Sequence, residues 1–168
     1  PLARALCVES VTTQRIGGRA RRPAATSSLG VPAYSAGMPS SLTFADYGTG
    51  IGDAVSVIRA NAVSAGLGAP VPPCPGWSVL DLVLHVGLAH RWATANLEGV
   101  PREGWPTEEQ IRDEGRAAPD VLDWFDEGMA RLLHVLASAP EDLQAFFFLK
   151  DAARPREAWA RRQCHETT

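Results

Sequence analysis

The chain has 168 residues, of which 45% are hydrophobic and 21% charged, and its formal net charge is -3. This composition is ordinary for a globular protein and predicts one domain with a sizeable core. The three cysteines show no CxxC spacing, and no stretch resembles a secretory signal or an 18-residue apolar span, which argues against disulfide-rich secreted and membrane-spanning proteins. We therefore expect a reduced, soluble, cytoplasmic protein.

The first forty residues differ from the rest of the chain in charge. They carry five Arg and one Glu, a charge of +4, whereas the remainder holds eleven basic and eighteen acidic residues, a charge of -7. Pro, Gly, Ser, Thr and Ala dominate this part, and such a composition cannot bury enough apolar surface to offset chain entropy. We predict a disordered basic segment over residues 1–41. A nucleic-acid-binding arm is the alternative, although no aromatic residues alternate with the arginines.

The two ends of the sequence suggest that it is a fragment. It begins at Pro1 rather than at a Met, and it ends inside a charged, patterned segment. We expect a longer natural protein, with Met38 as a candidate true start.

The first predicted helix begins near Phe44 and ends at Ala65. Its apolar residues recur at steps of three and four, which places them on one stripe of a helix. Thr43 or Asp46 is the expected cap. Residues 66–77, rich in Pro and Gly, then predict a stiff loop.

The second predicted helix follows Ser78, with Asp81 three residues later in an arrangement like a capping box. It is apolar nearly all round and should therefore be the most buried helix. Gly99 and Pro101 end it. The charged residues 101–119 predict a long connection with a short helix over 107–116.

Pro119 suits the first position of the next helix, whose apolar stripe runs from Leu122 to Leu136 and whose opposite face is charged. The apolar run 146–149 fits either a helix or a strand, and we expect it to pack across one end of the fold. Pro155 begins a last helix that should still be running at Thr168. Four amphipathic helices with one long crossover predict an all-α four-helix bundle, in which metal sites form where inward-facing side chains meet.

Four histidines and one glutamate are the polar residues to weigh as metal ligands. His85 lies on the most apolar helix, where a hydrogen-bonded core histidine is the ordinary alternative. His90 points about 140° away from His85, so the two cannot share one ion as an i, i+4 pair would. Glu166 shares a helix face with Trp159, and an ion pair with a neighbouring Arg is its ordinary role. We expect His134 on the solvated face and His165 on a flank.

Cys74 and Cys164 are the candidate nucleophiles. Neither has the spacing of a catalytic Cys/His pair, and Cys is common as a small buried hydrophobic residue. No nucleophile elbow or phosphate-binding loop is present. Covalent catalysis by the chain itself is therefore unsupported.

Two separated motifs resemble a known family. The stretch VPPCPGWSVLDLVLHVGLAHRWA, residues 71–93, looks like the characteristic motif of the mycothiol-dependent maleylpyruvate isomerase family, and PREAWARRQCHETT, residues 155–168, is similar to its Arg-rich second motif. The likeness spans residues 42–168. It implies the family's N-terminal metal-binding domain, a DinB-like four-helix bundle.

The resemblance also implies a three-ligand site, usually for zinc. Carried over by position, His85 is the first ligand and Glu166 the second, and the third falls two residues beyond Thr168. The implied cofactor is the thiol mycothiol, acting with a small electrophilic substrate such as maleylpyruvate. A C-terminal domain of the same chain is the implied partner, and neither nucleic acid nor a membrane is expected. We accordingly expect the 168-residue chain to bind zinc poorly and to be inactive by itself.

Two other functions remain open from the sequence. A zinc protease would use His165 and a His at position 169 as ligands, with Glu166 as the general base. A non-catalytic metal-binding or regulatory helical module is the second alternative. The substrate, the metal and the oligomeric state do not follow from the residues.

Overall fold

A computed structural model describes residues 42–148 and 154–168, and in this part of the chain every regular element is a helix. The all-α prediction is therefore confirmed. The predicted disorder of residues 1–41 lies outside the described residues, as do Cys7 and Leu149. The elements are α1 (Phe44–Ala65), α2 (Val79–Leu97), the 3-10 turn η2 (Arg102–Gly104), α3 (Glu108–Ala117), α4 (Val121–Ser138) and α5 (Pro155–Thr167).

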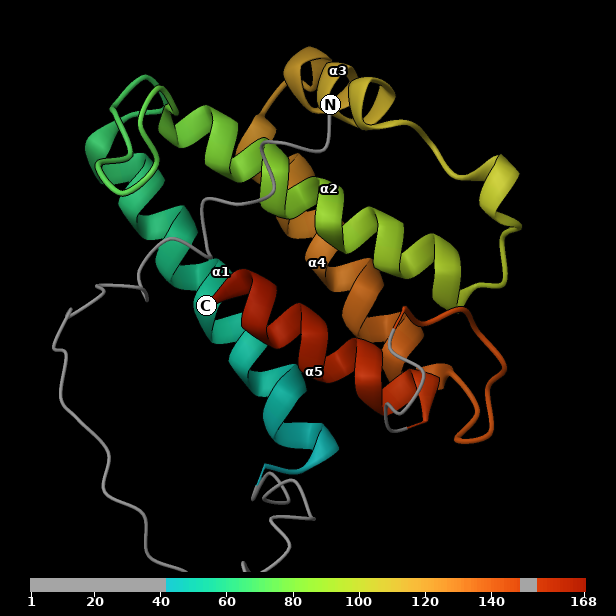
Figure 1. The fold of residues 1–168 in the computed structure, drawn as a ribbon. Helices are drawn as coiled ribbons and strands as arrows, with labels where there is room; N and C mark the ends of the chain where they lie inside the picture. Colours follow the sequence, from blue (N-terminus) through green and yellow to red (C-terminus); the bar gives the residue numbers. More distant parts are fainter. Residues whose placement is uncertain (1–41, 149–153) are drawn as a thin grey trace, which may run out of the picture. The chain divides into compact units, whose positions relative to one another are not determined.

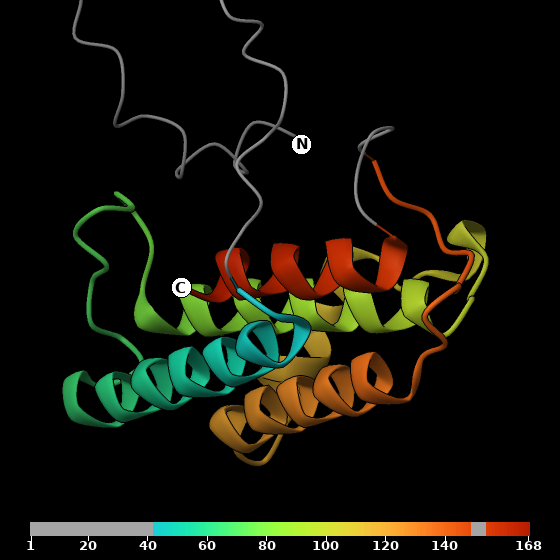
Figure 2. The ribbon, with the colours of Figure 1, turned by 90° about the horizontal axis from the view of Figure 1, so that it is seen from below.

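The four longer helices form a bundle within the unit Leu42–Thr168 (Figure 1). The most extensive packing is between α2 and α4 and between α1 and α5. Figure 2 shows α2 and α5 together above α1 and α4. The short α3 belongs to the long crossover between α2 and α4 and packs on both of them. The predicted bundle with one long crossover is thus confirmed, and α5 lies between α1 and α2.

Local hydrogen bonds set the beginnings of α1 and α2 as predicted. The Thr43 hydroxyl accepts from the amide of Asp46, whose carboxylate accepts from the Thr43 amide. Ser78 and Asp81 form the same capping box. The Thr43 and Ser78 hydroxyls also donate to the carboxylates of Asp46 and Asp81. The hydroxyl and amide donors stabilise the ionised carboxylates and so lower the pKa of Asp46 and of Asp81. Thr107 caps α3 in the same way, with Gln110 as its partner.

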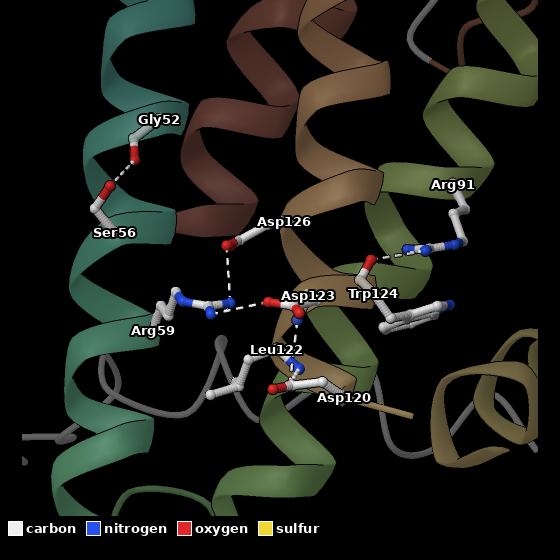
Figure 3. Close-up of polar contacts among 9 residues, drawn as sticks. All are labelled: Gly52, Ser56, Arg59, Arg91, Asp120, Leu122, Asp123, Trp124 and Asp126. Atoms are coloured by element: carbon white, nitrogen blue, oxygen red, sulfur yellow. Dashed lines mark hydrogen bonds and ion pairs between the residues drawn. The ribbon is translucent and has the colours of Figure 1, made fainter. Parts of the chain in front are cut away.

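The prediction for the start of α4 was wrong by two residues. Pro119 lies before the helix, and Asp120 is the N-cap. The Asp120 carboxylate accepts from the amides of Leu122 and Asp123, as Figure 3 shows, at 2.7 and 3.3 Å. An N-cap side chain that accepts from amides without a partner in the helix stabilises a helix start by about 1 kcal/mol. The last helix begins at Pro155 as predicted and runs to Thr167, and the Thr168 amide still donates to the Cys164 carbonyl.

Two hydrophobic clusters form the core. One joins α1, α2, α3 and α4 around the fully buried Leu84 and Phe125. The other joins α1, α2, α4 and α5 around Ile51, Leu132 and Trp159. The predicted apolar stripe of α4 supplies both clusters, and the charged face opposite to it is largely exposed.

Two arginines tie α4 to neighbouring helices (Figure 3). The Arg91 guanidinium of α2 stacks on the Trp124 ring at 3.6 Å and donates to the Trp124 carbonyl at 2.8 Å. Arg59 of α1 pairs with Asp123 and Asp126 of α4 at 2.9 and 2.8 Å. The Arg of the HRW stretch therefore has a packing role.

Side-chain hydrogen bonds hold the crossover between α2 and α4, and the segment around Phe146, against the helices. Trp92 donates to the carbonyl of Pro106 at 2.8 Å, which holds the crossover against α2. Asn96 and Trp159 both donate to the carbonyl of Phe146, at 2.7 and 2.9 Å. The residues at 146–148 form neither helix nor strand, and Phe147 packs on Trp159.

None of the helices in the described residues is long and apolar enough to cross a membrane.

Candidate metal centre

His85 lies half-buried near the start of α2, two turns after the Ser78 cap. Its ring and that of Trp77 in the preceding loop pack in a T-shaped arrangement, with ring centroids 5.1 Å apart. Burial lowers the pKa of His85, and the charge of Arg112 lowers it further, while Glu166 and Glu108 act in the opposite direction. The imidazole is therefore neutral at neutral pH, the form in which a histidine binds metal.

Glu166 lies in the last turn of α5, and its side chain is 26% exposed. It forms an ion pair with Arg162 one turn earlier, the ordinary role considered for it from the sequence. The buried face of this turn consists of Gln163 and Thr167, and Trp159 is buried on the same helix as expected. Glu166 thus sits at the edge of the buried face.

The bundle brings His85 and Glu166 into electrostatic range of each other across the contact between α2 and α5. The charge of Glu166 acts against the lowering of the His85 pKa although 81 positions separate the two residues in the sequence, and α5, which carries Glu166, packs on α2. Arg112 and Glu108 act on the same imidazole from α3. The region around His85 is therefore bordered by Trp77, by α3 and by the end of α5.

His85 and Glu166 together offer at most two donor groups to a metal ion. An imidazole nitrogen and a carboxylate oxygen from facing helices are ligand types that zinc prefers. Among residues 42–148 and 154–168, no group of three or more His, Cys, Asp or Glu side chains lies close enough to hold an ion. A complete site would need a further ligand from outside the described residues.

His90 is the buried polar residue whose partner the sequence did not reveal. Its side chain is 0% exposed, its ring stacks on Phe125, and its Nε2 lies 3.0 Å from the Thr167 hydroxyl of α5. The all-round apolar character of α2 indicates burial, but no local pattern points to a residue 77 positions away. His134 and His165 are both exposed, as expected for residues outside a buried site.

The two cysteines in the described residues differ in their surroundings, and neither is in a disulfide bond. Cys74 is half-buried in the loop before α2. Cys164 packs in the cluster around Trp159, and burial raises the pKa of its thiol. A raised pKa leaves less thiolate at neutral pH and makes Cys164 a poor nucleophile.

Comparison with known proteins gives one positive result. A family model described as the mycothiol maleylpyruvate isomerase N-terminal domain matches residues 51–168. No curated protein and no solved structure gives a significant match.

Proposed function

The chain thus belongs to the mycothiol maleylpyruvate isomerase N-terminal domain family, and from this premise we propose that its helical unit is the divalent-metal-binding part of a mycothiol-dependent enzyme. The metal we expect is zinc. The reaction is an isomerisation or a thiol transfer on a small electrophilic metabolite, for which maleylpyruvate is the model substrate. His85 and Glu166 are the proposed ligands, and a third is expected two residues beyond Thr168.

The packing of α5, which carries Glu166, on α2, which carries His85, supports the proposal best, together with the effect of the Glu166 charge on the pKa of His85. Both residues belong to the stretches that resemble the family motifs. A glutamate and a histidine four residues apart share one helix face, so a ligand at position 170 would extend the site from the face that carries Glu166. Two ligands from one helix and one from a facing helix is a common way to build a metal site in a bundle.

The residues around the proposed site have defined tasks. Trp77 restrains the His85 ring by edge-on packing, and burial keeps that ring unprotonated. Glu166 must exchange its ion pair with Arg162 for the metal. A zinc ion bound by three protein ligands keeps one position open, at which it lowers the pKa of a thiol or polarises a carbonyl.

The chemistry of the proposed reaction calls for a thiol from outside the chain. In an isomerisation, a thiolate adds to a carbon of a cis double bond conjugated with a carbonyl, and the electron pair of the double bond moves to the carbonyl oxygen. Rotation about the resulting single bond and loss of the thiolate give the trans isomer and regenerate the thiol. The raised pKa of Cys164 makes that residue unsuited to this step.

Zinc titration tests the proposed ligands. The chain is extended past Thr168 so that position 170 carries either a histidine or an alanine. We expect the histidine-extended chain to bind zinc tighter by more than about 100-fold, since even outer-shell partners of a metal contribute about 10–100-fold. His85→Ala and Glu166→Gln in the histidine-extended chain should abolish this gain. Equal affinity in all four proteins would refute the site.

Turnover separates the enzyme from its alternative. The full-length protein is supplied with zinc, mycothiol and maleylpyruvate or a related cis enone, and the trans product is followed. Thiol-dependent turnover that His85→Ala abolishes supports the enzyme. Zinc binding without turnover of any thiol-dependent substrate would favour a non-catalytic metal-binding or regulatory module.

A further inference from the structure

His90 is placed where an apolar residue would cost less. Its imidazole is fully buried and stacks on Phe125 of α4 with ring centroids 5.8 Å apart. Its Nδ1 has no hydrogen-bond partner among the described residues. Burying a polar ring that is only partly hydrogen-bonded costs free energy that a leucine of similar size would not. The imidazole makes one contact that a leucine could not make, the hydrogen bond to Thr167.

That hydrogen bond joins α2 to the last turn of α5. The Thr167 hydroxyl donates to the Gln163 carbonyl at 2.7 Å, so its oxygen is left to accept from the Nε2–H of His90 at 3.0 Å. Both ends of the contact are buried. The Thr167 hydroxyl is fixed to its own helix through the Gln163 carbonyl. The bond from His90 therefore restrains both the rotation of this turn of α5 about the helix axis and its distance from α2.

The bond joins the two helices that carry the proposed ligands. On α2, His90 follows His85 by five residues, about 7.5 Å along the helix and about 140° around it. On α5, Thr167 directly follows Glu166, so any rotation of Thr167 moves the carboxylate too. A metal bound by His85 and Glu166 would hold α2 and α5 at one point, and the His90–Thr167 bond holds them at a second. Helices held at two points on different faces cannot rotate freely against each other. The buried His90–Thr167 contact can therefore set the direction in which the partly exposed Glu166 points.

We propose that His90 is a positioning residue, which through its hydrogen bond to Thr167 orients the last turn of α5 so that Glu166 faces His85. The inference rests on the proposed function, because it takes His85 and Glu166 to be metal ligands. His90 itself touches neither substrate nor metal. The structure assigns it to holding one ligand-bearing helix against the other.

The test uses the full-length protein with a matched pair of variants. Thr167→Val keeps the shape of the side chain and removes the hydroxyl, whereas Thr167→Ser keeps the hydroxyl. Zinc affinity is measured by competition with a chelator, and amide hydrogen exchange over residues 163–168 is measured in the metal-free protein. Thr167→Val should weaken zinc binding by about tenfold, the lower range for an outer-shell partner, and speed exchange in the last turn. Thr167→Ser should resemble the wild type in both measurements.

Two further variants complete the test. His90→Leu should weaken zinc binding like Thr167→Val, and combining the two should cause no additional loss, because both remove the same bond. If Thr167→Val binds zinc like the wild type while His85→Ala does not, the positioning role is wrong and the proposed site stands. Equal loss in Thr167→Val and Thr167→Ser also overturns it. If His85→Ala binds zinc like the wild type, the proposed site itself is wrong and the inference falls with it.

Discussion

Mild acid should destabilise the fold through His90. The ring is buried beside Phe125, and this burial, with a smaller effect of Arg91, lowers the pKa of His90 from 6.5 to about 4. The unfolded chain therefore takes up a proton at a higher pH than the folded chain does. Because the folded pKa is the lower one, the stability due to neutral His90 is fully present above pH 6.5 and is lost as the pH falls toward 4.

The size of this loss follows from the difference between the two pKa values. Each pKa unit corresponds to about 1.4 kcal/mol, so lowering the pKa from 6.5 to about 4 corresponds to about 3 kcal/mol in total. Most of it, about 2 kcal/mol, should be lost between about pH 7 and about pH 4.5. The lowered pKa values of Asp46 and Asp81 affect stability mainly below this interval, since the ordinary pKa of an aspartate is 3.8.

Urea denaturation followed by tryptophan fluorescence and circular dichroism measures the effect at constant ionic strength over the same pH interval. Burial also lowers the pKa of His85, so the wild type alone would report both histidines. The comparison is therefore between the wild type and His90→Gln, which cannot titrate but retains an amide donor. The free energy of unfolding of the wild type should fall by about 2 kcal/mol more than that of the variant. Parallel pH profiles for the two proteins would refute the reasoning.

Two further predictions concern stability alone. A Cβ added at Gly87 would lie 2.4 Å from the Trp124 ring, so Gly87→Ala should cost about 1–3 kcal/mol in the free energy of unfolding. Gly52→Ala on α1 is the control, because a Cβ there meets nothing within 4 Å, and it should stabilise by up to about 1 kcal/mol; similar effects at the two glycines would contradict the packing at Gly87. Ser78→Ala removes the hydroxyl that accepts from the Asp81 amide and should cost about 1 kcal/mol by urea denaturation. A Ser78→Thr variant that fails to recover most of this loss would show that the cap is not the cause.

The features that the sequence determined are mostly those decided by neighbouring residues. Thr43 and Ser78 cap their helices through side chains three residues away, and such bonds form once the local backbone is helical. Steps of three and four between apolar residues likewise define the buried stripe of α4. At the start of α4 the signal at Pro119 was misleading, and the observed hydrogen bonds made Asp120 the N-cap.

The arrangement of the proposed metal site depends on contacts between residues far apart in the sequence. Sequence motifs identified His85 and Glu166 as candidate ligands, and their role as ligands stays a prediction. The effect of the Glu166 charge on His85 depends on how α5 packs on α2, and so does the hydrogen bond between His90 and Thr167. Such contacts join residues far apart in the sequence, and they are set by helix rotation and crossing angle, which side chains from the whole core determine together. The sequence by itself therefore determined the helices, most of their ends and the family, and only the tertiary structure decided which buried polar groups meet.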